Sequence, residues 1–222
     1  SSGSGLALAA RSNIVEITSW STLFPDAGYE FVWRYPLLVE LNWLCGTNAT
    51  SLQIINIHLK AYDDSESFNR RFASCELLSD YINDNPDINI IVLGDYNDEI
   101  TDSQNNNSLW PLVSHDAVAF ATEPIADNVD YASYPSWPSF IDHIALSTSL
   151  FDELSGGNIT TIRVDDYTGY SNYQNNISDH RPVLWSFSVE EVELTAGLVI
   201  NEIMQNPAAV ADAVGEWIEI TN

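Results

Sequence analysis

The sequence predicts a layered fold of the α+β or α/β class. Segments with the composition of β-strands outnumber the one clear amphipathic helix, and the two kinds of element alternate irregularly along the 222 residues. The most strand-like segment is 88–93, INIIVL, in which five of six residues are aliphatic, as is typical of a strand buried on both faces. Asp95, Asn97 and Asp98 follow at once. We therefore expect functional groups in loops at the edge of a rigid sheet.

Three strands are predicted before this central one. The apolar run 5–10 is a short buried strand, and the longer β-type segment 30–43 is followed by a turn at 46–48 and the strand-like segment 51–57. These last two segments predict an antiparallel hairpin. Pro36 marks an edge position or a bulge in its first strand.

A helix is predicted between the hairpin and the central strand. Over residues 67–83 the apolar residues recur at spacings of three and four, which is the period of a helix with one buried face. Arg70 and Arg71 lie off this face, and the run 83–86, NDNP, ends the helix. The apolar face consists of Phe68, Phe72, Cys75, Leu78 and Ile82.

The C-terminal half predicts two further strands joined by loops. Residues 131–139 carry three aromatic residues and two prolines, which predicts a stiff loop with exposed rings. The strand 140–146 is interrupted by two polar residues, and the loop 165–177 leads to a last strand at 183–189.

The charge of the chain limits how it binds its partners. Seven basic and 32 acidic residues give a net charge of −25, so the overall field repels polyanions. If the protein acts on phosphodiesters, bridging metal ions must supply the attraction locally. No stretch of the sequence is long and apolar enough to span a bilayer, and we expect no membrane insertion.

The two cysteines, Cys45 and Cys75, leave two alternatives open. They form either one disulfide or two separately packed thiols, and we favour the thiols because Cys75 lies on the apolar face of a helix.

Four polar clusters occur in order along the chain. Each is weak evidence alone, since a histidine such as His58 at a strand end is more often a surface residue than a catalyst. Asp142 is more unusual, because an unpaired carboxylate inside an apolar strand costs several kcal/mol and so requires a partner, for which a histidine is suited. The clusters are NIHLK at 56–60, GDYN at 94–97, IDHI at 141–144 and SDHRP at 178–182, each at the end or middle of a strand.

This ordered set resembles the endonuclease/exonuclease/phosphatase superfamily, which includes pancreatic deoxyribonuclease and the abasic-site endonucleases. The resemblance covers residues 5–188 and is strongest to secreted bacterial nucleases, and it implies a partial four-layer αββα sandwich. The segments LVINEI and GEWIEITN near the C-terminus resemble the start of a lamin-tail domain, an immunoglobulin-like β-sandwich. We expect an enzyme domain at 1–189, a linker at 190–196 and the first strands of a second domain at 197–222.

The resemblance also implies roles for individual residues. His180 would lie beside the scissile phosphate, with Asp142 accepting its other ring N–H. Asp95 would orient or deprotonate the attacking water, with Asn97 beside it. His58 would donate to a phosphoryl oxygen. Asp179 would ligate Mg²⁺, or Ca²⁺ or Mn²⁺ in its place. Arg34 would contact the substrate backbone, with a structural ion pair as the alternative. We assign no role to His115 or His143, and the aromatic loop would either stack on substrate or pack at the rim.

One departure from the family pattern sets a further expectation. Family members begin with a strand that carries an asparagine and a second that ends in a metal-binding glutamate, and Glu16, Glu30 and Glu40 do not stand in that context. We therefore expect the chain to begin part of the way into the domain and to be inactive alone.

The expected function is that of a metal-dependent phosphodiesterase, a secreted, monomeric endonuclease with DNA or RNA as its partner. One alternative is a phosphatase for inositol phosphates or a sphingomyelinase of the same fold. Another is a non-catalytic secreted binding module.

Overall fold

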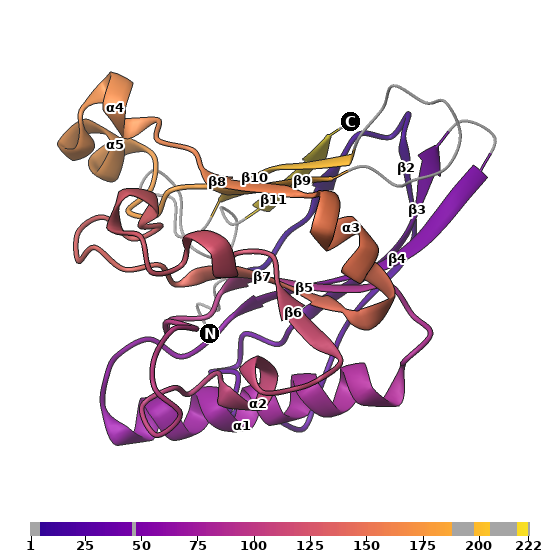
Figure 1. Cartoon of the computed structure of the whole chain (residues 1–222), viewed down its shortest axis with the longest axis horizontal. Coiled ribbons are helices and arrows are strands. Elements are labelled where there is room, and N and C mark those ends of the chain that lie inside the picture. The colour runs from indigo at the N-terminus through magenta and orange to yellow at the C-terminus, as the bar shows by residue number, and fades with distance from the viewer. Residues whose placement is uncertain (1–4, 46–47, 188–197, 205–216, 222) are drawn as a thin grey trace.

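The computed structural model describes residues 5–45, 48–187, 198–204 and 217–221. Two β-sheets stack face to face, and helices α1 and α2 lie against the outer face of one of them (Figure 1). The larger sheet has the strand order β2-β3-β4-β5-β7-β6 and the smaller one β1-β11-β10-β9-β8. The layered α/β class predicted from the sequence is therefore confirmed.

The strands and helices have the following bounds. The larger sheet contains β2 Val15–Thr22, β3 Leu37–Cys45, β4 Asn48–His58, β5 Ile90–Asp95, β6 Val118–Phe120 and β7 Asp142–Ser147. The smaller sheet contains β1 Ala9–Ala10, β8 Asn158–Thr161, β9 Val183–Phe187, β10 Leu198–Met204 and β11 Trp217–Thr221. The α-helices are α1 Ser65–Asp84, α2 Trp110–Val113, α3 Phe151–Gly156, α4 Asp165–Thr168 and α5 Tyr170–Asn176, and short 3₁₀ turns occur at Glu123–Ile125, Val129–Tyr131 and Thr148–Leu150. None of the helices in the described part of the chain has the length and apolar character needed to cross a bilayer.

The central strand is the best-predicted element. All six residues of β5 are buried, because the strand pairs in parallel with β4 on one side and antiparallel with β7 on the other. The predicted hairpin is also present as β3 and β4. Pro36 precedes β3, and its carbonyl accepts a hydrogen bond from Leu23 at 3.0 Å.

Other elements differ from the sequence predictions for identifiable reasons. The edge strand β2 was missed because most of its side chains are exposed and so lack a hydrophobic pattern. The predicted strand 30–43 begins only at Leu37, since Val32 and Trp33 adopt positive φ angles of 56° and 57°, which break an extended chain. The predicted loop 165–177 holds the short helices α4 and α5.

Helix α1 begins two residues earlier than predicted, because the Asp64 side chain accepts a hydrogen bond from the Ser67 amide at 3.0 Å and caps the first turn. Its buried face also differs: Phe68 and Phe72 are only half-buried, whereas Arg70 and Arg71 are buried. The two arginines are tolerated there because they donate to carbonyls of neighbouring loops. Cys75 on this helix is a free, buried thiol, and the side chain of Cys45 lies outside the described residues.

The two C-terminal strands are described by their backbone. β10 pairs antiparallel with β9, and β11 pairs antiparallel with β10 and in parallel with β1. The predicted linker 190–196 lies outside the described residues, and the assignment of 197–222 to a separate lamin-tail domain stays a prediction.

Gly94 near the end of β5 permits the close approach of β4. Its φ angle is +133°, and a Cβ atom built there would lie 2.0 Å from the Ile57 carbonyl oxygen. We expect Gly94→Ala to lower the free energy of unfolding by at least about 2 kcal/mol, since strain and backbone overlap add. Urea titration of both proteins measures the change.

Gly156→Ala in α3 is the matched control, because a Cβ there meets nothing within 4 Å. That variant should be neutral or slightly more stable. Equal stability of the two alanine variants would contradict the assigned strain.

Candidate active site

Three of the predicted catalytic residues lie in one row across adjacent strands. The parallel register of β4 and β5 places His58 opposite Asp95, and the antiparallel register of β5 and β7 places Asp95 opposite Asp142. Neighbouring strands are about 4.8 Å apart, and directly paired residues point to the same face of a sheet. The side chains of the row therefore converge, and His58 Nε2 lies 3.3 Å from Asp95 Oδ2.

A second histidine reaches this row from the other sheet. His180 precedes β9, and its Nδ1 lies 2.8 Å from Asp142 Oδ2 while its Nε2 lies 4.0 Å from Asp95 Oδ2. Its backbone is held on both sides, because its amide donates to Ser178 Oγ at 3.0 Å and its carbonyl accepts from the Tyr173 hydroxyl at 2.7 Å. The loop before β9 thus presents the imidazole at a defined position.

The expected histidine partner of Asp142 is therefore His180 and not its sequence neighbour His143. Successive side chains of a strand point to opposite faces, so His143 faces away from the row. Thr122 Oγ1 lies 3.0 Å from His143 Nδ1 and the Asp98 carbonyl oxygen lies 3.2 Å from its Nε2. Burial lowers the pKa of His143 to about 4, so the ring is neutral near pH 7 and serves the core.

Asp95 is held by the residue that follows it closely in sequence. Asn97 donates its amide to Asp95 Oδ1 at 2.8 Å and its side-chain Nδ2 to Oδ2 at 3.0 Å. The same Nδ2 lies 3.1 Å from the Leu59 carbonyl oxygen, which ties the ends of β4 and β5 together. A φ angle of 53° at Asn97 makes this turn, and asparagine tolerates such an angle better than most residues.

The electrostatics of the cluster favour a protonated His180. Burial lowers the pKa of His180, but the Asp142 carboxylate, its hydrogen bond, and the charges of Asp95 and Asp179 outweigh burial and raise the pKa to about 10. Burial raises the pKa of Asp95, and His58 and His180 oppose that rise. At neutral pH the Nε2 of His180 is accordingly an N–H donor that faces a buried carboxylate.

Arg34 and Asp179 lie beside the row. Arg34 Nε donates to the His58 carbonyl at 3.1 Å and Nη2 to the Leu59 carbonyl at 2.7 Å, so the side chain supports the end of β4. Its contact with substrate stays a prediction. Asp179 directly precedes His180 in sequence. Burial raises the pKa of Tyr134, and the charge of Asp179 raises it further.

Two ion pairs that hold the loops of the site were not predicted from the sequence. Arg71 lies 3.4 Å from Asp98 and donates to the Lys60 and Tyr62 carbonyls. Arg181 binds Asp165 through two bonds of 2.9 and 2.6 Å. The available signal for Arg181 was its position directly after His180, whereas no local signal marked Arg71. Tyr134 belongs to the predicted aromatic loop, and its ring centroid lies 5.0 Å from that of His180.

The described residues do not form a chelating metal site. Among them no group of three His, Cys, Asp or Glu side chains is arranged to hold a metal ion. Both oxygens of Asp95 already accept hydrogen bonds from Asn97. The donor set that remains, centred on Asp179, is smaller than a hard divalent cation needs without water or substrate oxygens.

Comparison with known proteins identifies the fold. No family model matches the chain, and no curated protein matches it. A humanized D. rerio TDP2 with 14 mutations matches with a TM-score of 0.52 and 14% identity over 77% of this chain and 66% of that one. An endonuclease/exonuclease/phosphatase family protein from Bacteroides thetaiotaomicron has a TM-score of 0.49 and 19% identity over 78% and 65%. The mannosyl-6-phosphatase Bt3783 of the same organism has a TM-score of 0.49 and 17% identity over 78% and 67%.

The structural neighbours are thus endonuclease/exonuclease/phosphatase proteins, and the TDP2 match shows that this chain has their fold. The chain spans just under two thirds of that TDP2 chain, at 66% of its length. The resemblance seen in the sequence is confirmed at the level of the fold.

The Asp142–His180 pair makes a testable prediction about pH. Because the folded-state pKa of His180, about 10, lies above the ordinary 6.5, its ionisation stabilises the fold fully below about pH 6.5, and this contribution is lost as the pH rises toward 10. Asp142→Asn should lower the pKa of His180 by roughly 1 to 3, since the nearest negative charge is removed. Titration of the His180 ring protons by NMR measures this pKa.

Asp166→Asn serves as the control, because that carboxylate is exposed and pairs with Arg163 instead. It should leave the His180 titration unchanged. An Asp142→Asn protein in which His180 titrates like the wild type would show that another charge sets this pKa.

Proposed function

We propose that this protein is a metal-dependent phosphodiester hydrolase, an extracellular and monomeric endonuclease that acts on DNA or RNA. The observation that supports this most directly is the pairing of two histidines and two carboxylates at one point, with His180 Nε2 and Asp95 Oδ2 4.0 Å apart. The fold shared with endonuclease/exonuclease/phosphatase proteins is consistent with hydrolytic chemistry, and the substrate is our inference from the site.

The geometry suits general acid–base catalysis at a phosphoryl group. Asp142 accepts the Nδ1–H of His180 and orients the ring, so that the protonated Nε2 can donate to an oxygen of the phosphate. Asp95 lies between His58 and His180, and its raised pKa brings a buried carboxylate closer to the range of a general base for water. His58 supplies a second donor on the opposite side of Asp95.

A divalent cation in this reaction would neutralise charge on the phosphoryl oxygens. Asp179 is the candidate ligand in this chain. The described residues do not complete a chelating set, so water or substrate oxygens would have to fill the rest of the cation's coordination shell.

The alternative functions differ in whether they require acid–base residues. A phosphatase or a sphingomyelinase of this fold uses the same acid–base residues, so only substrate turnover distinguishes it from a nuclease. A non-catalytic binding module needs no acid–base residues. The buried and costly placement of Asp95 and Asp142 favours catalysis, since unused buried carboxylates destabilise a fold.

The first test is plasmid nicking by the protein expressed from its full reading frame. We expect divalent cations to be required, chelation to abolish cleavage, and His180→Ala to reduce the rate at least about 100-fold, the usual effect of removing a general acid or base. His115→Ala is the matched control, because His115 lies in a loop outside the catalytic row and accepts a hydrogen bond from the Ala117 amide. Intact plasmid together with turnover of inositol phosphates or sphingomyelin would assign the rival function.

The second test concerns residues 1–222 alone. With Asp179 as the main remaining ligand, this chain should bind Mg²⁺ weakly and show no appreciable nuclease activity. Calorimetric titration at about 0.15 M salt separates a true site from the diffuse attraction of a −25 charge, which salt screens. A stoichiometric micromolar site accompanied by plasmid cleavage would contradict the prediction.

A further inference from the structure

Two strongly exposed aromatic side chains lie in the loops next to His58. Among the described residues six aromatic side chains are exposed, and two of them, Trp33 at 65% and Tyr62 at 77%, lie in the loops that adjoin His58. Both have positive φ angles, 57° for Trp33 and 82° for Tyr62. Such angles are unfavourable for bulky residues and are retained where the surrounding structure enforces them. The backbone that carries these two exposed rings is thus held in an unfavourable conformation.

Hydrogen bonds from arginine side chains connect these two loops to the end of β4 and to α1. Arg34, next to Trp33, donates to the carbonyls of His58 and Leu59. Arg71 of α1 donates to the carbonyls of Lys60 and Tyr62. The Trp33 and Tyr62 loops therefore flank the end of β4, where His58 enters the site.

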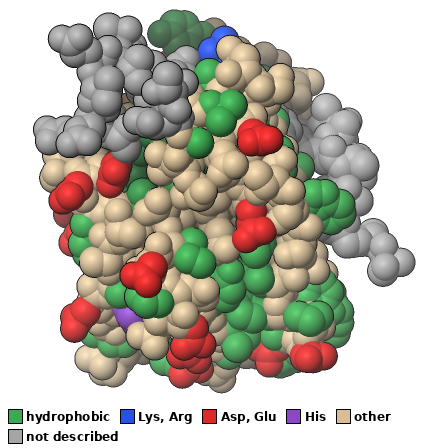
Figure 2. All heavy atoms as spheres, turned by 90° about the vertical axis from the view of Figure 1, so that its right-hand side faces the viewer, with side chains coloured by type: hydrophobic (Ala, Val, Ile, Leu, Met, Phe, Trp, Pro, Cys, Tyr) green, Lys and Arg blue, Asp and Glu red, His purple; other side chains and the backbone are tan. Residues whose placement is uncertain are grey.

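Basic residues are concentrated at the same place. Four of the seven basic residues in the chain lie in these loops and the start of α1: Arg34, Lys60, Arg70 and Arg71. In contrast, the face shown in Figure 2, at the right-hand side of Figure 1, carries acidic side chains with basic ones only at its upper edge. The end of the molecule that holds His58 therefore has more of the basic residues than the rest of the chain, although Glu66 and Asp98 pair with two of them.

The cations also support the rings. Arg70 Cζ lies 4.3 Å from the ring centroid of Tyr29 and 6.0 Å from that of Trp33, and Lys60 Nζ lies 4.4 Å from that of Tyr62. A cation packed against one face of a ring holds that ring in place. The high exposure of Trp33 and Tyr62 leaves ring surface open to a second planar group.

We propose that Trp33 and Tyr62 form a stacking platform for the unpaired bases of a single-stranded nucleic acid, beside the catalytic row. This inference deepens the proposed function and rests on it. Each unpaired base offers a π-face to an aromatic side chain, and such stacking is sequence-independent. A duplex hides these faces and brings two rows of phosphates toward a protein of charge −25. The platform therefore selects single strands over duplexes.

The test measures binding separately from cleavage. Fluorescence anisotropy with a labelled oligothymidylate of about 12 nucleotides, in a chelator that prevents hydrolysis, gives the affinity of the wild-type chain and its variants. We expect Trp33→Ala and Tyr62→Ala each to weaken binding roughly 5- to 150-fold, the range for loss of one base stack. Trp33→Phe and Tyr62→Phe should retain most of the affinity, which separates stacking from misfolding. A duplex of the same length should bind at least about tenfold more weakly.

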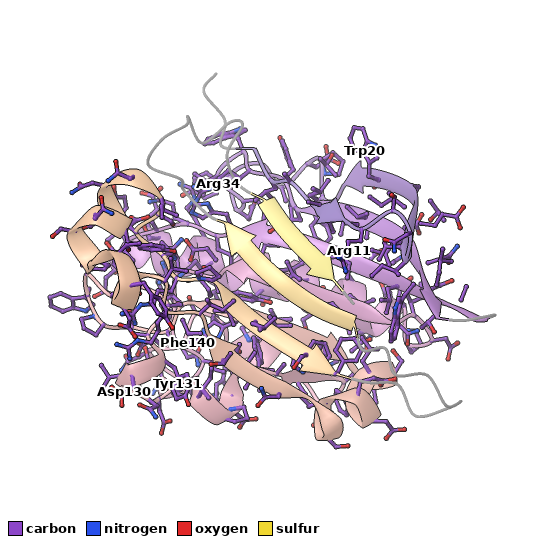
Figure 3. All side chains as sticks on the ribbon, turned by 90° about the horizontal axis from the view of Figure 1, so that it is seen from above. Arg11, Trp20, Arg34, Asp130, Tyr131 and Phe140 are labelled. Carbon is purple, nitrogen blue, oxygen red and sulfur yellow. The ribbon has the colours of Figure 1, made fainter. Side chains whose placement is uncertain are left out.

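Trp20→Ala is the matched control. Trp20 is 72% exposed, yet it lies on β2 opposite Val39, whose partner Ile54 is four residues before His58, and Figure 3 shows it apart from Arg34. This variant should bind the oligonucleotide like the wild type. No binding by the wild type, equal binding of duplex, or an equal loss in Trp20→Ala would each overturn the proposal.

Hydrolysis of bis(p-nitrophenyl) phosphate by the protein from its full reading frame distinguishes this proposal from the proposed function, because that substrate carries no base. Platform-dependent binding without any phosphodiester hydrolysis would refute the proposed function and support the platform. Hydrolysis without a preference for single strands would do the reverse.

Discussion

The site depends on one buried pair, Asp142 and His180, because these residues come from different sheets. Asp142 opens β7 in the larger sheet and His180 precedes β9 in the smaller one, and their side chains meet at 2.8 Å. Asp142 is not tolerated alone, since an unpaired buried carboxylate costs several kcal/mol and breaking a buried pair commonly costs about 3–5 kcal/mol. The packing of the two sheets and the ionisation of the site are thus linked.

Two further ion pairs hold the loops that surround Asp142 and His180. Arg71 of α1 joins Asp98 and the loop after His58, and Arg181 joins Asp165 of α4 to the loop that carries His180. Arg181 also donates to the Ala132 carbonyl, which connects the aromatic loop. These planar guanidinium groups satisfy several acceptors at once, so short irregular segments remain ordered without a hydrophobic core of their own.

The basic residues are unevenly distributed in this molecule. The net charge of −25 describes the whole chain, whereas the end of β4 collects most of the arginine and lysine residues. Local charges within a few ångströms act on a bound group more strongly than distant ones that salt screens. The few cations near the end of β4 therefore act on neighbouring groups at short range, although Glu66 and Asp98 pair with two of them.

The sequence by itself determined the buried strand β5, the β3–β4 hairpin, helix α1 and the order of the four polar clusters, because strong apolar periodicity and strand-end carboxylates are local signals. It also indicated that Asp142 needs a partner. The family resemblance named His180 as that partner, but local pattern alone does not separate His180 from His143. The tertiary structure supplies the physical reason, because strand register and side-chain alternation turn His143 to the opposite face. The edge strand β2, the burial of Arg70 and Arg71, and the exposed rings of Trp33 and Tyr62 likewise depend on neighbours distant in sequence. Local periodicity does not record such contacts, because it reports which face of an element is apolar and not what lies against it.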